Sequence, residues 1–345
     1  MPGRRSTPRP RPGGPPQTTD AGPRRRASAS AFARARRARL PALVLAVGAA
    51  VAGVPATSPA SAGTPRTAAE GPIAAVGAEN QYADVIAQVG GRYVSVSSIM
   101  SNPNADPHAF EASPAVARLV ASARLVVQNG AGYDSFMNRV ESASPSRSRT
   151  VVVVARLLGL ASNVRNPHLW YEPGTMSKVA SAVADELAGM EPGHRSYFDR
   201  NAARFDASLG AWRAAIARLR ARFRGAPVGV TEPVADYLLS ACGLDDKTPW
   251  ALQAAIMNGV DPSPQAVATE ERLVGRHEVR VLLYNEQVTD PLTQSLLGLA
   301  HRSDVPVVGV YETMPTPGYD YQTWMLAETS AIEAALARGR STGRL

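Results

Sequence analysis

Short apolar runs alternate with amphipathic segments along the chain from Gly71 onward. One of these runs, Val151-Val152-Val153-Val154, is apolar at every position, which is typical of a strand buried on both faces of a parallel sheet. The segments between the runs carry apolar residues at helical spacing. Alternation of this kind predicts repeated β-α units, so we expect an α/β fold with parallel sheets.

The two halves of the chain repeat this pattern. In the first half, Ser113-Pro114 is typical of a helix start, because serine caps a helix and proline fits its first turn. We also expect Thr175 to cap a helix. Residues 338–345 are expected to form a frayed tail. The expected strands are 72–76, 93–100, 125–127, 151–154, 228–230, 279–284 and 305–311, and the expected helices are 80–89, 134–140, 234–241, 291–301 and 319–337, with others beginning at 114, 175 and 264.

The segment between the halves has the most regular periodicity. Its apolar residues are spaced four and three alternately, which predicts one amphipathic helix from about Pro192 to Phe223, roughly 45 Å long. We interpret it as a rigid spine packed along two lobes; a free coiled-coil arm for dimerisation is the competing interpretation. The apolar positions are Phe198, Ala202, Phe205, Leu209, Trp212, Ile216, Leu219 and Phe223, and the arginines expected on the solvated face are Arg204, Arg213, Arg218 and Arg220.

These patterns divide the chain into segments with different expected roles. They are an export segment at 1–62, a linker at 63–70, an N-terminal α/β lobe at 71–191, the linking helix at 192–224, a C-terminal α/β lobe at 225–337 and the tail at 338–345.

The distribution of charge argues against a nucleic-acid partner. The net charge is +8, but residues 1–62 hold eleven arginines and a single acid, Asp20, and therefore contribute +10. The remaining residues carry −2. The globular part is mildly acidic, so a basic face for nucleic acid is not expected.

Residues 1–62 have the composition of a targeting segment. An apolar run from Leu40 to Ala56 follows an arginine-rich stretch, and Ala60-Ser61-Ala62 has the small-x-small pattern of a signal-peptidase site. We therefore expect export to the cell surface, the extracellular space or the periplasm; an uncleaved N-terminal anchor is the alternative. The lone cysteine, Cys242, lies at an apolar helix end and is expected to be a buried, inert thiol.

Two matching pentapeptides carry the clearest chemical signal. They are Asp106-Pro107-His108-Ala109-Phe110 and Asn166-Pro167-His168-Leu169-Trp170. Proline fixes its own φ and keeps the preceding residue extended, so each histidine leaves a stiff turn. A pre-oriented imidazole suits a metal site. The other histidines, His194, His277 and His301, lie in charged surroundings and are expected on the surface.

Four candidate donors follow predicted strands: His108, His168, Glu232 and Glu312. Ligands of parallel α/β sheets bind at that edge, so one ion between the lobes could meet all four. Two imidazoles and two carboxylates suit Zn²⁺ as a tetrahedral set, and suit Mn²⁺ if the carboxylates become bidentate. Taken singly, each histidine could be a surface residue and each acid a helix cap.

The Gly130-x-Gly132 pair lacks the third glycine of a dinucleotide loop and is interpreted as a tight turn.

These residues resemble those of the solute-binding proteins of zinc and manganese ABC importers. The resemblance extends from about Gly71 to Leu336. The resemblance rests on both pentapeptides, on Ile86 to Gly91 and on Val126 to Gly132. It implies two lobes joined by a long helix, with His108 and His168 at the first two ligand positions. Glu232 stands where many zinc members have a third histidine, and Glu312 where the family usually has aspartate. The histidine-rich loop of many zinc members and a lipidation cysteine are missing.

The resemblance implies a non-enzymatic, monomeric protein that delivers Zn²⁺ or Mn²⁺ to an ABC importer permease. It would be held at the membrane through that permease or through an uncleaved N-terminal anchor. A secreted metallohydrolase is the alternative if Glu232 is a general base rather than a ligand, because an activated water then completes the shell. A cell-surface adhesin with a structural metal is a third hypothesis.

Overall fold

The computed structural model describes residues 71–104, 107–315 and 317–345. The described residues belong to one compact unit. The predicted export segment and linker, and Asp106 of the first pentapeptide, lie outside the described residues. None of the helices within the described ranges is long and apolar enough to cross a membrane.

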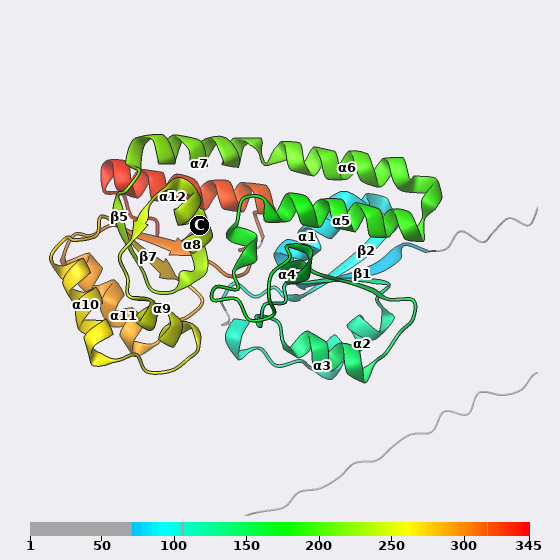
Figure 1. Cartoon of the computed structure of the whole chain (residues 1–345), viewed down its shortest axis with the longest axis horizontal. Coiled ribbons are helices and arrows are strands. Elements are labelled where there is room, and N and C mark those ends of the chain that lie inside the picture. The colour runs from blue at the N-terminus through cyan, green and yellow to red at the C-terminus, as the bar shows by residue number, and fades with distance from the viewer. Residues whose placement is uncertain (1–70, 105–106, 316) are drawn as a thin grey trace, which may run out of the picture. The chain divides into compact units, whose positions relative to one another are not determined.

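Two four-stranded parallel sheets organise this unit (Figure 1). All strand pairs are parallel, so the predicted fold class is confirmed. The first sheet has the order β2-β1-β3-β4, with β1 at Ile73–Glu79, β2 at Val94–Met100, β3 at Leu125–Gln128 and β4 at Thr150–Val153. The second has the order β6-β5-β7-β8, with β5 at Pro227–Val230, β6 at Asp245–Asp246, β7 at Leu282–Asn285 and β8 at Val307–Val310.

Helices separate the strands in both halves, as the alternating pattern predicts. The helices of the first half are α1 (Asn80–Gly90), α2 (Pro114–Ser122), α3 (Phe136–Ala143), α4 (Val154–Leu157) and α5 (Thr175–Met190). Those of the second half are α8 (Asp236–Cys242), α9 (Trp250–Met257), α10 (Pro264–Gly275), α11 (Pro291–Arg302) and α12 (Tyr321–Arg338). The 3-10 helices are η1 (Gly91–Tyr93), η2 (Pro107–Ala109), η3 (Leu169–Tyr171), η4 (Pro192–His194) and η5 (Pro233–Ala235).

The N-caps of α2 and α5 can be compared with the helix starts predicted from the sequence. Ser113 accepts a hydrogen bond from the Val116 amide and caps α2, with Pro114 in the first turn, as predicted. The prediction for Thr175 is wrong, because Gly174 is the N-cap of α5. Thr175 is the first helical residue, and its hydroxyl donates to the Glu172 carboxylate (3.1 Å).

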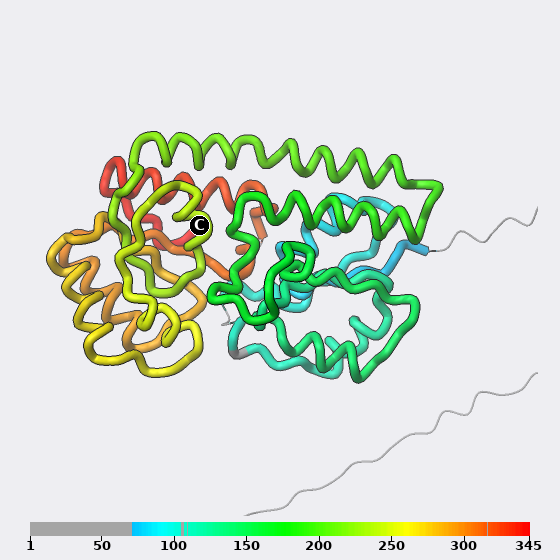
Figure 2. The backbone as a smooth tube through the Cα atoms, in the orientation of Figure 1, coloured from blue at the N-terminus to red at the C-terminus, as the bar shows by residue number. Residues whose placement is uncertain are grey.

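The predicted spine runs along the unit (Figure 2), but it is two consecutive helices rather than one. α6 spans Arg195–Ser208 and α7 spans Gly210–Phe223. At the junction the Leu209 amide donates to Asp206 O (3.2 Å), three residues back, so the helix tightens locally and bends. The prediction of an uninterrupted helix is wrong at this point.

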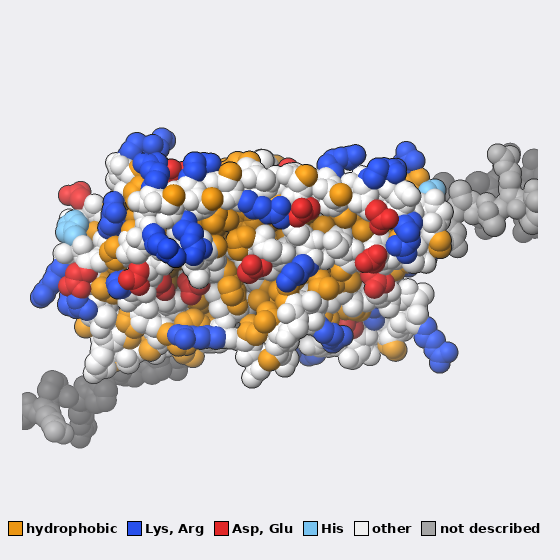
Figure 3. Space-filling view, turned by 45° about the horizontal axis from the view of Figure 1, so that its top comes forward, with side chains coloured by type: hydrophobic (Ala, Val, Ile, Leu, Met, Phe, Trp, Pro, Cys, Tyr) orange, Lys and Arg blue, Asp and Glu red, His pale blue; other side chains and the backbone are white. Residues whose placement is uncertain are grey.

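The spine packs on the unit that contains it, which favours the spine interpretation over a free arm. α6 lies against α5 and α1, and α7 lies against α12 and α8. Phe198, Leu209 and Leu219 are fully buried by this packing. On the outer face, Arg213 pairs with Asp206 (2.6 Å) and the other three arginines predicted there are exposed. In Figure 3, Lys and Arg side chains are interspersed with acidic ones over the visible face.

One large hydrophobic core joins the two sheets. Trp212 of α7 donates from Nε1 to Thr329 Oγ1 of α12 (2.9 Å), and its ring meets Tyr321 edge-on at 5.9 Å. The same Tyr321 stacks on Phe205 of α6. Because both lobes share this core, their relative motion requires repacking and is expected to be small.

The expectation of a frayed tail is wrong. Thr342 forms a parallel bridge with Val308, in which its amide donates to Val307 O and its carbonyl accepts from the Gly309 amide (both 2.8 Å). The physical reason is that β8 is an edge strand with backbone groups that need partners. Gly309 permits the approach, since a Cβ there would lie 2.0 Å from Gly343 O.

Candidate metal centre

The candidate donors all lie just beyond the carboxyl ends of parallel strands. His108 is in η2, in the connection that follows β2, and His168 immediately precedes η3, in the connection that follows β4. Glu232 follows β5 by two residues, and Glu312 follows β8 by two residues. The donors therefore come from the edges of two different sheets, as the sequence predicts.

Three of the four predicted residues converge. One potential ligand atom from each of His108, His168 and Glu312 lies within 4.8 Å of the others. The Nε2 atoms of His108 and His168 lie 3.1 and 3.2 Å from the same atom, Glu312 Oε2. The His168 and Glu312 side chains are fully buried, whereas the His108 imidazole is 23% exposed. The group is therefore closed to solvent on all sides except that of His108.

Glu232, the fourth predicted donor, is connected to this group through Asn285. Its side chain is buried, and its Oε1 accepts a hydrogen bond from Asn285 Nδ2 (3.1 Å). The same nitrogen donates to Glu312 Oε1 (2.8 Å). One amide therefore links the two carboxylates.

Asn166 fixes the orientation of His168. Its Oδ1 accepts from the His168 backbone amide (2.9 Å) and from His168 Nδ1 (2.8 Å), while its Nδ2 donates to Pro233 O (2.6 Å). These partners settle which end of the amide faces the ring, so Nδ1 carries a hydrogen. The Nε2 lone pair of neutral His168 is then directed at Glu312, which is the tautomer that a metal ligand needs.

Opposing effects set the charge of the buried pair. Burial raises the pKa of the Glu312 carboxyl, but hydrogen bonds with His108 and His168 outweigh it and hold that pKa well below its usual range. Burial also lowers the pKa of His168 despite the opposing hydrogen bond to Glu312. Glu312 is therefore ionised, and burial favours the neutral form of His168.

Two side chains in contact with the candidate donors were not predicted from the sequence. The Tyr133 hydroxyl donates to Glu312 Oε2 (2.9 Å), and the Tyr133 ring meets His108 and His168 edge-on at 5.4 and 5.7 Å. Tyr133 follows the predicted tight turn, in which Gly130, Ala131 and Gly132 all have positive φ. Asn285 is the last residue of β7. Its position at the carboxyl end of a strand is the sequence feature from which its place beside the donors could have been predicted.

The remaining predicted residues lie away from this group. His277 and His301 are exposed, as expected. His194 is half-buried and stacks on Tyr93 at 4.1 Å. Cys242 is fully buried, and burial raises the pKa of its thiol to about 12, so it is inert as predicted.

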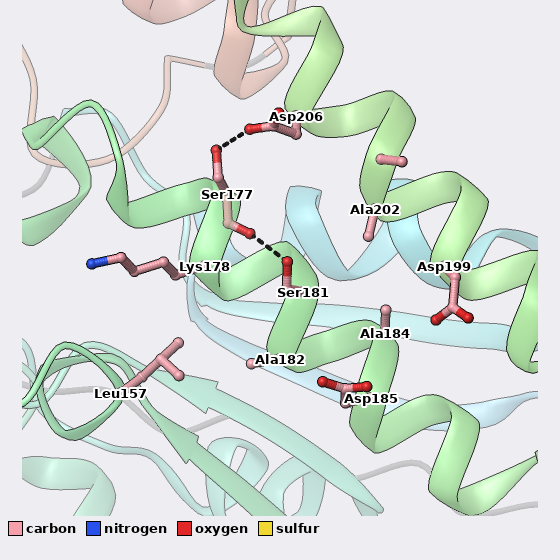
Figure 4. Close-up of a pocket in the computed structure, with 11 residues that line it drawn as sticks. Leu157, Ser177, Lys178, Ser181, Ala182, Ala184, Asp185, Asp199, Ala202 and Asp206 are labelled. Carbon is pink, nitrogen blue, oxygen red and sulfur yellow. Dashed lines mark hydrogen bonds between the residues drawn. The ribbon is translucent and has the colours of Figure 1, made fainter.

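A groove of about 730 Å³ lies between α5 and α6 (Figure 4). Ser177 and Asp206 face one another across it and are hydrogen bonded (2.6 Å). Small and acidic side chains, together with Leu157 and Lys178, form its walls. None of the four predicted donors lines it, so its size does not make it the candidate site.

Comparison with known proteins places these observations in a family context. The family described as "Zinc-uptake complex component A periplasmic" matches residues 76–335. A putative metal-binding protein of Thermotoga maritima is 31% identical over 94 residues, which cover 27% of this chain and 33% of that protein. The manganese-binding lipoprotein MntA of Bacillus subtilis is 24% identical over 136 residues, covering 38% of this chain and 44% of that protein. The chain thus matches less than half the length of these two curated relatives.

A solved structure extends the similarity over nearly the whole described unit. The periplasmic zinc-binding protein TroA of Treponema pallidum superposes with a TM-score of 0.66 and 18% identity. The match covers 78% of this chain and 100% of that one. At this identity the match shows a shared fold: two parallel sheets joined by a long bent helix.

Proposed function

The chain belongs to the family of periplasmic zinc-uptake component A proteins, and we propose that it captures Zn²⁺, or Mn²⁺, for an ABC-type metal importer. In this proposal His108 and His168 hold the ion from one lobe, and Glu232 and Glu312 complete its shell from the other. The protein works outside the cytoplasm as a monomer and hands its ion to the importer's permease. Attachment to the membrane is through that permease or through the N-terminal segment.

A single contact carries this proposal. His168 Nε2 and Glu312 Oε2 lie 3.2 Å apart at the centre of the group. Nδ1 already carries a hydrogen through its contact to Asn166, so the hydrogen bond between Nε2 and Glu312 Oε2 needs a further proton between the two atoms. Two facing acceptors repel one another unless a proton or a metal ion lies between them. Their buried arrangement is therefore suited to a cation.

The chemistry of the donors limits the cation to a few metals. Imidazole nitrogen suits Zn²⁺ and other late first-row ions, and two carboxylates neutralise a buried dication when both bind it as anions. Mg²⁺ and Ca²⁺ prefer shells made of oxygen alone. This donor set supports Zn²⁺ first and Mn²⁺ second.

A binding role suits the site better than catalysis. With Glu232 as the fourth ligand beside the three converging residues, the tetrahedral shell is complete and leaves no position for a metal-activated water, which a metallohydrolase needs. The shared core of the two lobes favours a small tilt with ordering of the His108 loop over a wide hinge. His108, the partly exposed donor, then lies on the path by which the ion enters and leaves.

Metal analysis tests the proposal. The purified protein is expected to bind one Zn²⁺ per chain, measured by elemental analysis and by competition with a chelator, with Mn²⁺ titrated in parallel. Absence of both metals at stoichiometric protein concentration contradicts the proposal. Glu232→Ala separates capture from hydrolysis: capture requires weakened binding, whereas full occupancy with a metal-bound water at the fourth position supports the hydrolase.

A further inference from the structure

Asn285 lies between the two acidic candidate ligands because of the order of the strands. In the second sheet β7 is paired with β5 on one side and with β8 on the other. Glu232 follows β5 and Glu312 follows β8, so the last residue of β7 faces both. Asn285 is 1% exposed, and its surroundings are therefore protein rather than solvent.

Hydrogen bonds fix which end of the Asn285 amide faces the carboxylates. Its Oδ1 accepts from the Gln287 backbone amide (3.0 Å), and its own backbone amide donates to Thr231 Oγ1 (3.0 Å). The NH₂ group must therefore point the other way. Its two hydrogens serve two acceptors, Glu312 Oε1 at 2.8 Å and Glu232 Oε1 at 3.1 Å.

Each carboxylate thus has one oxygen held by the same rigid donor. For Glu312, the second oxygen, Oε2, faces both imidazoles and accepts from the Tyr133 hydroxyl (2.9 Å). The bond from Asn285 draws each Oε1 towards the amide, so it favours ligation through the other oxygen alone over ligation through both. Two such carboxylates and two imidazoles provide four donors, the number that Zn²⁺ takes in closed protein sites. Mn²⁺ prefers a larger shell richer in oxygen, which needs bidentate carboxylates.

We propose that Asn285 determines metal selectivity, by keeping Glu232 and Glu312 monodentate and so favouring Zn²⁺ over Mn²⁺. This inference rests on the proposed function and assigns a role to a residue that binds no metal itself. Asn285 acts as a positioning residue, because its hydrogen bonds hold the Oε1 atoms of Glu232 and Glu312 away from the ion.

Substitution of Asn285 provides the test. In Asn285→Ala both Oε1 atoms lose their donor, so both carboxylates can chelate and Mn²⁺ gains relative to Zn²⁺. The ratio of Zn²⁺ to Mn²⁺ affinity, measured by chelator competition, is expected to fall about 10- to 100-fold, the effect typical of losing an outer partner of a ligand. Asn285→Asp keeps an acceptor for Gln287 but lacks the NH₂ group, and its ratio should also fall.

Asn201→Ala is the matched control. Asn201 is a buried asparagine of α6 whose Nδ2 donates to Val89 O (2.9 Å), away from the proposed ligands. Its loss should lower stability without changing the affinity ratio. An unchanged ratio in folded, metal-binding Asn285→Ala and Asn285→Asp overturns the inference.

Visible absorption of bound Co²⁺ gives a readout that a purely structural role would not change. The unsubstituted protein is expected to give the intense bands of a four-coordinate ion, and the Asn285 variants the weak bands of a higher coordination number. Weak, six-coordinate bands in the unsubstituted protein overturn the inference even if no variant folds.

The failure of the selectivity role can be distinguished from the failure of the proposed function. If the unsubstituted protein binds no dication at all, the proposed function fails. If it binds Zn²⁺ and Mn²⁺ with six ligands each, only the selectivity role fails.

Discussion

His168 illustrates how a single residue is prepared for its role. Asn166 fixes the tautomer of the ring, and it also ties the loop to the second lobe, through its donation to Pro233 O and through the Tyr237 hydroxyl that donates to Asn166 O (2.9 Å). The amide at the start of the second pentapeptide is therefore part of the site rather than a turn residue alone. Its equivalent in the first pentapeptide, Asp106, lies outside the described residues.

Replacing His168 should abolish tight metal binding. His168→Ala removes a nitrogen donor from the fully buried part of the group, so the loss of Zn²⁺ affinity should exceed the ~10- to 100-fold typical of an outer partner. Chelator competition measures the change. His194→Ala, in which a histidine stacked on Tyr93 is removed, serves as the control and should keep its affinity.

Replacing Asn166 should weaken binding without abolishing it. Asn166→Ala leaves the His168 ring free to rotate and to take the other tautomer, and the expected loss of Zn²⁺ affinity is about 10- to 100-fold. Isothermal titration of Zn²⁺ checks this value. Unchanged affinity in a folded variant contradicts the orienting role.

Among the elements, the spine departs most clearly from its predicted form. Its apolar stripe is continuous across the break, since Phe205, Leu209 and Trp212 are all buried. The heptad-like spacing predicts which face is buried and cannot register a local change in hydrogen bonding. Gly210 opens α7 directly after the break, and the space around its missing Cβ is open.

Two glycine substitutions test the backbone at helix ends. Gly210→Ala should raise the free energy of unfolding by about 0.4–1 kcal/mol, because alanine fits a helical position and restricts the unfolded chain. Gly243→Ala should lower it by a similar amount or more, because Gly243 ends α8 at φ 69°. Urea denaturation of both variants gives the comparison, and equal signs contradict the assignment.

Across the whole described unit, a buried acid links the two lobes. The Tyr171 hydroxyl lies 2.8 Å from Tyr311 O and 2.7 Å from Glu328 Oε2, yet it has one hydrogen to donate. Both contacts are satisfied when Glu328 is protonated and donates to the hydroxyl oxygen. Burial raises the pKa of Glu328 to about 8, which agrees with this geometry.

Stability should therefore depend on pH through Glu328. Between its ordinary pKa of 4.5 and the folded value of about 8, the folded protein holds a proton that the unfolded chain has released. The free energy of unfolding should fall as pH rises through this window, with Glu328 contributing at most about 1.4 kcal/mol per pH unit. Glu328→Gln removes that contribution. Urea denaturation from pH 5 to 8 should show a shallower decline in the variant than in the unsubstituted protein.

The sequence by itself determined the local features of this protein. Alternating apolar runs specify β-α units because side-chain periodicity is a local property, and the two Pro-His pentapeptides specify stiff turns for the same reason. Strand ends also located His108, His168, Glu232 and Glu312. Tertiary structure alone decided how these positions meet. Asn285 lies between the acids because β7 pairs with β5 and β8, and Tyr133 reaches Glu312 across 179 residues of sequence. Strand order and lobe packing depend on contacts between distant residues, which no local pattern records.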